Sequence, residues 1–180
     1  MCKEGMVMKK ALLVIDIQND FLGENRNKKK FAYKNVDKLI SNINNDVEKN
    51  IEEGNEIIYI AHVLDNTFIS KKLFGYAISG TEGAQLCSKL KVSPDYHYFE
   101  KKHADAFSVK ELRFFLENHN INTIQICGID EGGCVSATAK GAVKLGLKVE
   151  MLKNSIDTVF PIKKVIKLRG ELKKKGVSYI

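Results

Sequence analysis

Residues 10–16 read KALLVID, a short apolar run that ends in the acid Asp16. The run is too short for a helix and polar residues follow it, so it predicts a buried β-strand. An ionised carboxylate directly after such a strand is costly unless it is paired or hydrogen-bonded. The stretch therefore indicates a buried sheet with a carboxylate at one of its edges.

The same alternation of apolar runs and helical patterns continues along the chain. Apolar residues recur at helical spacing over residues 36–51, and Gly54 follows where a helix would stop. We expect further strands at 57–61, 96–100, 121–127, 147–152 and 177–180. We expect further helices at 82–90, 134–145 and 162–175. Ser108 and Glu111 form a capping box that predicts one more helix, which begins at that point. Strands that alternate with helices, without hairpin turns, imply parallel strands joined by right-handed crossovers. The prediction is an α/β protein, a single three-layer α/β/α domain over residues 1–180.

Composition is consistent with one compact domain in a reducing compartment. At 180 residues and 44% hydrophobic content, one core suffices. Four cysteines (Cys2, Cys87, Cys127 and Cys134) show no C-x-x-C spacing, and the N-terminus does not read as a signal peptide. We therefore expect free thiols and a cytoplasmic protein. No apolar run reaches the roughly 20 residues of a membrane-spanning helix, so no membrane segment is expected.

The formal net charge of +7 is concentrated near the C-terminus. From Pro161 onward there are seven lysines and arginines against Glu171 alone, which leaves +1 for the rest of the chain. The charges alternate with apolar residues at helical spacing, as on the solvated face of an amphipathic helix. No aromatic residues are interleaved for base stacking, so we expect no nucleic-acid partner.

In an open parallel sheet, ligands bind outside the carboxyl ends of the strands. Cys134 lies beyond the fourth expected strand, after the turn 128–133 (GIDEGG), and opens the next expected helix. A helix N-terminus offers unpaired N–H donors and partial positive charge, which stabilise a thiolate. The alternative is an inert buried thiol, as expected for Cys127 inside the fourth strand.

Other polar residues at this edge also have ordinary alternatives. Asp16 has the alternative role of capping the turn that follows it. Lys101 and Lys102 both follow the third expected strand, and the residues alone do not choose between them. His62, at the end of the second strand, is the strongest of the four histidines as the base of a Cys–His pair.

Three segments contain these residues: 11–21 (ALLVIDIQNDF), 101–107 (KKHADAF) and 128–135 (GIDEGGCV). Together they resemble the isochorismatase-like cysteine hydrolases, which include nicotinamidases and carbamoyl-amide hydrolases. The intervening lengths also fit, so the resemblance covers nearly the whole chain. It implies a Rossmann-like, six-stranded parallel sheet in the order 3-2-1-4-5-6, and the family's spacing selects Lys101 over Lys102.

The resemblance implies a catalytic triad of Asp16, Lys101 and Cys134. Cys134 attacks a carbonyl, Asp16 takes its proton and returns it to the leaving amine, Lys101 supports the ionised forms, and water releases the acyl-enzyme. The resemblance also implies a cis peptide bond between Ile129 and Asp130, so that the backbone N–H groups of Asp130 and Cys134 form the oxyanion hole. In the implied strand order, Lys101 must reach back across the sheet to meet its partners.

The chain departs from the family in two places. Nicotinamidases of this family bind a metal through an Asp-x-His segment and a further histidine after the second strand, whereas this chain has His62 and Asp65 there and no other histidine before His97. We therefore expect no metal and no cofactor, and nicotinamide becomes a less favoured substrate. True isochorismatases cleave a vinyl ether without a cysteine nucleophile, so Cys134 indicates C–N cleavage of a small amide, lactam or ureido substrate. The turn 131–133 (EGG) is also unusual, because relatives often have threonine and bulkier residues there.

The substrate and the assembly are less determined by the residues. Phe21, Phe68, Tyr76 and Phe107 are candidate pocket walls for a small-molecule substrate, with ordinary packing as the alternative. A homodimer or homotetramer is implied by the resemblance alone. Two other functions stay open: a non-catalytic member that binds a small molecule or a partner, and a redox-sensing thiol, for which no resolving cysteine lies nearby in sequence.

Overall fold

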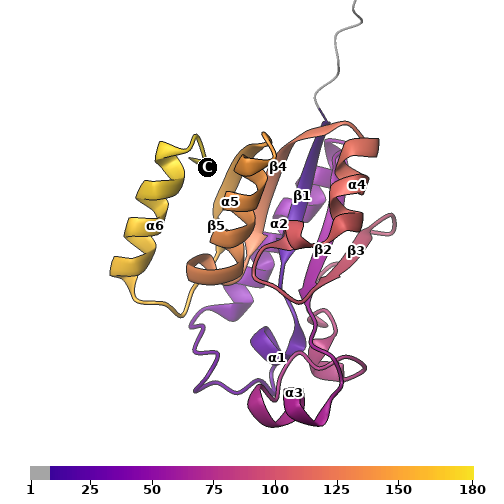
Figure 1. Ribbon diagram of the computed structural model, residues 1–180, viewed down its shortest axis with the longest axis vertical. Coiled ribbons are helices and arrows are strands. Elements are labelled where there is room, and N and C mark those ends of the chain that lie inside the picture. The colour runs from indigo at the N-terminus through magenta and orange to yellow at the C-terminus, as the bar shows by residue number, and fades with distance from the viewer. Residues whose placement is uncertain (1–8) are drawn as a thin grey trace, which may run out of the picture.

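A six-stranded parallel sheet forms the centre of the protein, whose computed structural model describes residues 9–180 (Figure 1). The strands are β1 (Lys9–Ile15), β2 (Glu56–His62), β3 (His97–Lys101), β4 (Ile121–Gly128), β5 (Lys148–Ile156) and β6 (Ser178–Tyr179). Their order is β3-β2-β1-β4-β5-β6, and every neighbouring pair is parallel. The predicted fold class and strand order are confirmed.

Helices cover both faces of the sheet. The helices are α1 (Asn19–Leu22), α2 (Val36–Glu52), α3 (Phe68–Leu73), α4 (Lys110–Asn118), α5 (Ser136–Lys144) and α6 (Ile162–Lys174). Helix α2 packs on one face, whereas α4 and α5 pack on the other and α6 lies beside α5 (Figure 1). The short helices α1 and α3 lie beyond the carboxyl ends of the strands, at the bottom of Figure 1. No helix in residues 9–180 has the length and apolar character needed to cross a bilayer.

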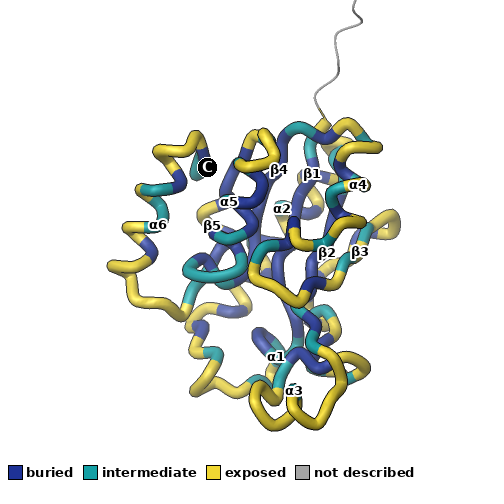
Figure 2. Tube along the Cα trace, in the orientation of Figure 1, coloured by how far each residue is buried: buried dark blue, intermediate teal, exposed yellow. Residues whose placement is uncertain are grey.

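Strand β1 is central because its apolar run is buried on both faces. Leu13 and Ile15 pack into the cluster beneath α4 and α5, while Leu12 and Val14 pack into the cluster beneath α2. Figure 2 shows the strands buried between helices whose outer surfaces are exposed. Continuous burial explains why the run reads as uninterrupted apolar sequence, as is usual for a parallel strand covered on both sides.

Two expected helix features are wrong. The segment 82–90 forms only a 3-10 turn, Glu82–Ala84, because its backbone pairs with the chain after β1: Asn19 N–H donates to the Gln85 carbonyl at 3.0 Å, and Cys87 N–H to the Ile17 carbonyl at 2.8 Å. The second wrong feature is the capping box, because Ser108 does not cap a helix. Its hydroxyl donates to the Asp105 carbonyl, and α4 begins at Lys110, directly after Val109. Helix α3, which the sequence analysis did not anticipate, begins after Thr67, whose hydroxyl accepts from the Ser70 N–H at 3.0 Å.

Gly128, the last residue of β4, has φ of +115° and lies against β1. A Cβ at this position would lie 2.1 Å from the carbonyl oxygen of Ile15. We expect Gly128→Ala to lower the free energy of unfolding by about 3 kcal/mol, because it combines a strained backbone with overpacking. Urea unfolding measures the loss.

Gly170→Ala is the matched control for this prediction. Gly170 is exposed within α6, and a Cβ there would meet nothing within 4 Å. This change is expected to raise stability by up to about 1 kcal/mol through helix propensity. Equal unfolding midpoints for Gly128→Ala and the unmodified protein would contradict the close approach of β1 and β4.

Candidate active site

Asp16 follows β1 in a left-handed backbone conformation, with φ of +56°. Its N–H donates to the Ile60 carbonyl at 2.8 Å, which ties the end of β1 to β2. The carboxylate is buried, and its Oδ2 accepts a hydrogen bond from Lys101 Nζ at 2.8 Å. Oδ1 is also buried and has no hydrogen-bond partner among residues 9–180. Asp16 therefore keeps one carboxylate oxygen available to accept a proton.

Lys101 is the last residue of β3 and is 1% exposed. Strand β2 separates β3 from β1, yet the side chain of Lys101 reaches both remaining members of the expected triad. Its Nζ lies 2.8 Å from Asp16 Oδ2 and 3.3 Å from Cys134 Sγ. Lys102 lies outside this group, because its ammonium group pairs with the exposed carboxylate of Asp65 at 2.7 and 2.8 Å. The structure thus brings Asp16, Lys101 and Cys134 together and leaves Lys102 at the surface.

Cys134 lies in a turn, Glu131–Val135, and not in the first turn of a regular helix. Gly133, with φ of −133° and ψ of −109°, interrupts the helical path, so α5 begins at Ser136. The sequence analysis placed Cys134 at the start of a helix, a position that favours a thiolate, with an inert buried thiol as the alternative. Burial and the carboxylate of Asp16 raise the pKa of Cys134 to about 12, although Lys101 acts to lower it. Desolvation therefore outweighs the favourable charges and the resting thiol is protonated, which is consistent with the implied role of Asp16 as the group that takes its proton.

The charges around the thiol define the resting site. Burial by itself would lower the pKa of Lys101, but Asp16 and Cys134 outweigh it, so the pKa is raised and Lys101 remains an ammonium. Burial and then Lys101 lower the pKa of His62, which favours a neutral imidazole. No hydrogen bond joins His62 to Cys134 in the described part of the chain, so the alternative Cys–His pair is not formed. The resting site contains a protonated thiol beside an ion pair.

The turn that carries Cys134 is held in place by the carboxylate of Asp130. The peptide bond between Ile129 and Asp130 is cis. The carboxylate of Asp130 accepts from Tyr33 Oη at 3.1 Å, from the N–H groups of Gly132 and Val159 at 2.8 Å each, and from the Thr158 hydroxyl. The backbone N–H of Asp130 has no acceptor among residues 9–180, which leaves it available to a ligand.

Glu131 and Gly132 account for the unusual composition of this turn. The Glu131 carboxylate is 1% exposed and binds Arg169 of α6 through two hydrogen bonds of 2.6 and 2.7 Å. Arg169 of the basic C-terminal helix therefore holds in place the turn that carries Cys134. A Cβ on Gly132 would lie 2.5 Å from the ring of Phe160, so only glycine lets that ring cover the turn.

A cavity of about 350 Å³ opens above the thiol. Asp16, His62 and Cys134 contribute its polar wall, and its other walls include Phe21, Lys30, Phe31, Tyr33, Tyr76, Ile129, Asp130, Gly133, Val159 and Phe160. Of the expected pocket walls, Phe21 and Tyr76 line this cavity. Phe68 is 79% exposed on α3, and Phe107 packs in the core beneath α4, so neither lines it.

The sequence analysis missed several of these walls. Lys30, Phe31 and Tyr33 come from the loop between α1 and α2, and Val159 and Phe160 come from the loop before α6. These loops contain no pattern that marks a site. Their place above the thiol follows from contacts with distant residues, such as the hydrogen bond from Tyr33 to Asp130.

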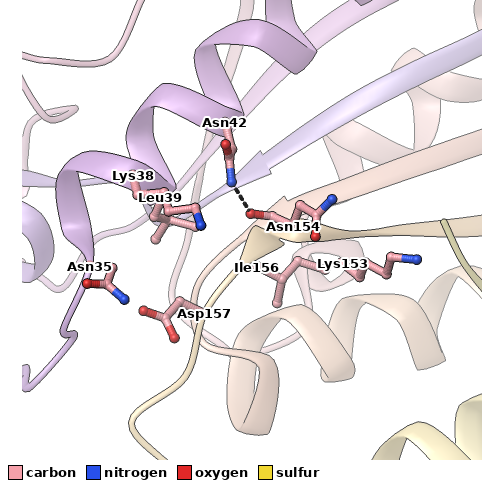
Figure 3. Close-up of a pocket in the computed structure, with 8 residues that line it drawn as sticks. All are labelled: Asn35, Lys38, Leu39, Asn42, Lys153, Asn154, Ile156 and Asp157. Carbon is pink, nitrogen blue, oxygen red and sulfur yellow. Dashed lines mark hydrogen bonds between the residues drawn. The ribbon is translucent and has the colours of Figure 1, made fainter.

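A larger hollow of about 460 Å³ lies between α2 and the end of β5 (Figure 3). Its lining consists of Asn35, Lys38, Leu39, Asn42, Lys153, Asn154, Ile156 and Asp157. Asn42 Nδ2 donates to the Asn154 carbonyl at 2.6 Å across it. The hollow contains no thiol or histidine, so we place the chemistry in the smaller cavity despite the difference in size.

The fold and the site define a class: a doubly wound α/β protein with a thiol, a carboxylate and an ammonium in contact at the carboxyl edge of its parallel sheet. The model of the isochorismatase domain matches residues 10–164. The chain belongs to this family.

Relatives agree with this assignment. The chain is 29% identical over 146 residues to a probable inactive nicotinamidase of Arabidopsis thaliana, which covers 75% of this chain and 73% of that protein. The crystal structure of the nicotinamidase PncA of Bacillus subtilis is similar with a TM-score of 0.82 and 26% identity, over 96% of this chain and 99% of that one. The pyrazinamidase of Pyrococcus horikoshii, solved in complex with zinc, shares the fold with a TM-score of 0.84 and 23% identity, over 96% and 98% of the two chains.

The zinc in the last of these structures raises the question of whether this chain has a matching donor set. No group of three histidine, cysteine, aspartate or glutamate side chains that could hold a metal occurs in residues 9–180. His62 is at the cavity, but the nearest carboxylate along the chain, Asp65, is bound by Lys102. The residues present do not fit a metal site of this kind, so no step below uses a metal.

Proposed function

We propose that this protein hydrolyses a C–N bond of a small amide, lactam or ureido substrate through a thioester on Cys134. The observation that carries the proposal is the contact of Lys101 Nζ with both Asp16 and Cys134 at the base of an apolar cavity. Membership of the isochorismatase family and likeness to a nicotinamidase support an amide as the substrate.

The resting thiol needs a base because its pKa is raised to about 12. In the proposed reaction, Asp16 Oδ1 accepts the thiol proton while Sγ attacks the carbonyl carbon. Lys101 lies beside both groups and stabilises the carboxylate and the developing thiolate. The backbone N–H groups of Asp130 and Cys134 donate to the oxyanion.

The second half of the reaction returns the site to its starting state. Asp16 gives its proton to the leaving nitrogen, the C–N bond breaks, and an acyl thioester remains on Cys134. Water then attacks the thioester, with Asp16 as the base, and the acid product leaves while the proton returns to the thiol. One amide and one water yield one acid and one amine or ammonia.

The assay is release of ammonia or amine from a panel of small amides, lactams and ureas, with Cys134→Ala as the blank. The expected result is release that requires Cys134, together with an acyl adduct on the peptide 128–135 in quenched samples. Equal release by both proteins would reject the thiol mechanism. A non-catalytic member of the family is the second candidate, favoured by the likeness to a probable inactive nicotinamidase; it predicts ligand binding without release.

Asp16 controls the reactivity of the thiol in a direction that can be measured. Its carboxylate raises the pKa of Cys134, whereas Lys101 lowers it. Asp16→Asn is therefore expected to lower the thiol pKa, because a thiolate then replaces the carboxylate as partner of Lys101. Alkylation of Cys134 by iodoacetamide at pH 8 should become faster in this variant, while hydrolysis falls by about 10²- to 10⁴-fold.

The pH profile provides the control for this prediction. In the unmodified protein the alkylation rate should keep rising about tenfold per pH unit far above pH 8, since the pKa lies near 12. In Asp16→Asn the rate should level off at lower pH. Slower alkylation in Asp16→Asn at every pH would show that the carboxylate activates the resting thiol and would contradict the assigned direction.

A further inference from the structure

Lys30 lines the same cavity as the thiol and has no carboxylate partner in the described part of the chain. Its ammonium lies 4.2 Å from the centre of the Tyr76 ring and donates to the Phe74 carbonyl at 3.1 Å. An ammonium has three donors, so these contacts leave it able to bind a further acceptor. Lys30 is an exposed residue of the loop between α1 and α2, whereas Lys101 is buried, so we place the Lys30 cation at the mouth of the cavity and Lys101 at its base.

The other charged groups of the cavity are paired with protein groups or lie beside the thiol. Asp16 and Lys101 pair with one another beneath the thiol. Asp130 accepts from four donors, so its carboxylate is not available to a cationic ligand. Asp16 Oδ1 is unpaired, but it lies beside the thiol, where the proposed reaction uses it as the base. Among the described residues that line the cavity, Lys30 is therefore the charge that can meet the other end of a ligand, and it is positive.

The wall beneath Lys30 is apolar and well packed. Phe21, Phe31 and Tyr76 meet edge to face, with ring centres 5.0 to 5.7 Å apart. An anionic group entering a cavity of this kind is costly unless a cation meets it. The cavity of about 350 Å³ is at the small end for ligand sites, which limits the substrate to a few carbon atoms or one ring.

We infer that the cavity takes small amides or ureas that carry a carboxylate, with Lys30 binding the carboxylate at the mouth while Cys134 attacks the amide at the base. This inference rests on the proposed function and adds the substrate class. Half-amides of short dicarboxylic acids and N-carbamoyl amino acids have the required groups at their two ends. Lys30 is then the residue that determines specificity.

The first experiment compares charged substrates with neutral ones of the same shape. Succinamate is paired with 4-methylpentanamide, and N-carbamoylglycine with isobutylurea, so that an isopropyl group replaces each carboxylate. The unmodified protein should turn over the charged member of each pair at least about tenfold more efficiently in kcat/KM, since hydrogen bonds to charged groups are the stronger ones. Its KM for the charged member should rise with ionic strength, and its KM for the neutral member should not.

Lys30→Met tests the residue itself. This variant should lose about 10- to 100-fold in kcat/KM for the charged substrates, mostly through KM, and less than about twofold for the neutral ones. Lys29→Met is the matched control because Lys29 is the adjacent exposed lysine and is not among the cavity walls. It should match the unmodified protein on both members of each pair.

Binding measured without turnover separates this inference from the proposed function. In the Cys134→Ala background, calorimetry with succinamate should show affinity that falls at least about tenfold on adding Lys30→Met but not on adding Lys29→Met. Absence of ammonia release from every substrate would reject the proposed function, and the binding result would still decide the role of Lys30. Equal losses for charged and neutral ligands in Lys30→Met, or preference of the unmodified protein for the neutral members, would overturn the inference.

Discussion

Cys134→Ala is expected to lower kcat/KM by about 10⁴-fold or more while the protein remains folded. In the proposed reaction the thiol of Cys134 is the nucleophile, and Asp16 and Lys101 act on the substrate through it. Alanine removes only the sulfur, and Cys134 is partly exposed to the cavity, so little packing is lost. Steady-state kinetics on the substrate that the panel identifies, with circular dichroism and thermal unfolding of the same samples, measure both effects.

Cys127→Ala is the matched control. Cys127 lies inside β4, is fully buried, and belongs to the core cluster under α2. Its loss creates a small cavity and should reduce stability, but kcat/KM per folded molecule should stay within about twofold because Cys127 is not among the residues that line the active-site cavity. If Cys134→Ala retained more than a few per cent of the activity, or if both variants lost activity equally, the assignment of the nucleophile would fail.

Lys101→Met is expected to reduce the free energy of unfolding by about 3 to 5 kcal/mol, besides abolishing turnover. The side chain of Lys101 is completely buried and that of Asp16 nearly so, and their charged atoms are 2.8 Å apart. Removing the ammonium leaves a buried carboxylate without its partner, and desolvation of that unpaired charge dominates the cost. Urea unfolding at pH 7 gives the difference in stability directly.

Two further variants test whether the cost comes from the unpaired charge. Asp16→Asn combined with Lys101→Met removes both charges and should recover about half of the loss or more, which is a coupling that additive effects would not produce. Lys102→Met breaks the exposed pair with Asp65 and should cost less than about 1 kcal/mol. Equal stability of Lys101→Met and Lys102→Met would mean that the Asp16–Lys101 pair is not buried in solution.

The structure of the site gives one basic residue of the C-terminal helix a structural role. The sequence places most of the net charge there, and α6 presents most of it to solvent. Arg169 is the exception, because it binds the buried carboxylate of Glu131 in the turn that carries Cys134. The helix therefore contributes to the position of the thiol as well as to the surface.

Much of the fold could be predicted because the strands are buried on both faces. Continuous apolar runs such as residues 10–16 identify these strands, and their alternation with helical patterns requires parallel pairing. Prediction failed where a segment's backbone pairs with a distant one. Residues 82–90 contain helix-compatible residues, yet their hydrogen bonds go to Ile17 and to the chain beside it, which no local pattern reveals.

The candidate site could likewise be predicted only in part. Strand ends alone indicated Asp16 and Cys134, and the family resemblance selected Lys101 from two adjacent lysines. The sequence shows that Cys134 precedes a helix, a position that favours a thiolate, but it does not show the burial that raises the pKa of the thiol.

The apolar run 10–16 and the segments around Lys101 and Cys134 thus determined by themselves the fold class and the order of the chemical groups along the chain, because strand periodicity is a local property of the residues. The tertiary structure alone decided which loops cover the thiol, and with them the place of Lys30 and Phe160. It also decided the burial that keeps the thiol protonated and holds Asp16 and Lys101 as an ion pair. The positions of the loops and the burial of the site both depend on contacts between residues far apart in sequence. Much of the free energy of such contacts comes from the removal of groups from water when the chain folds.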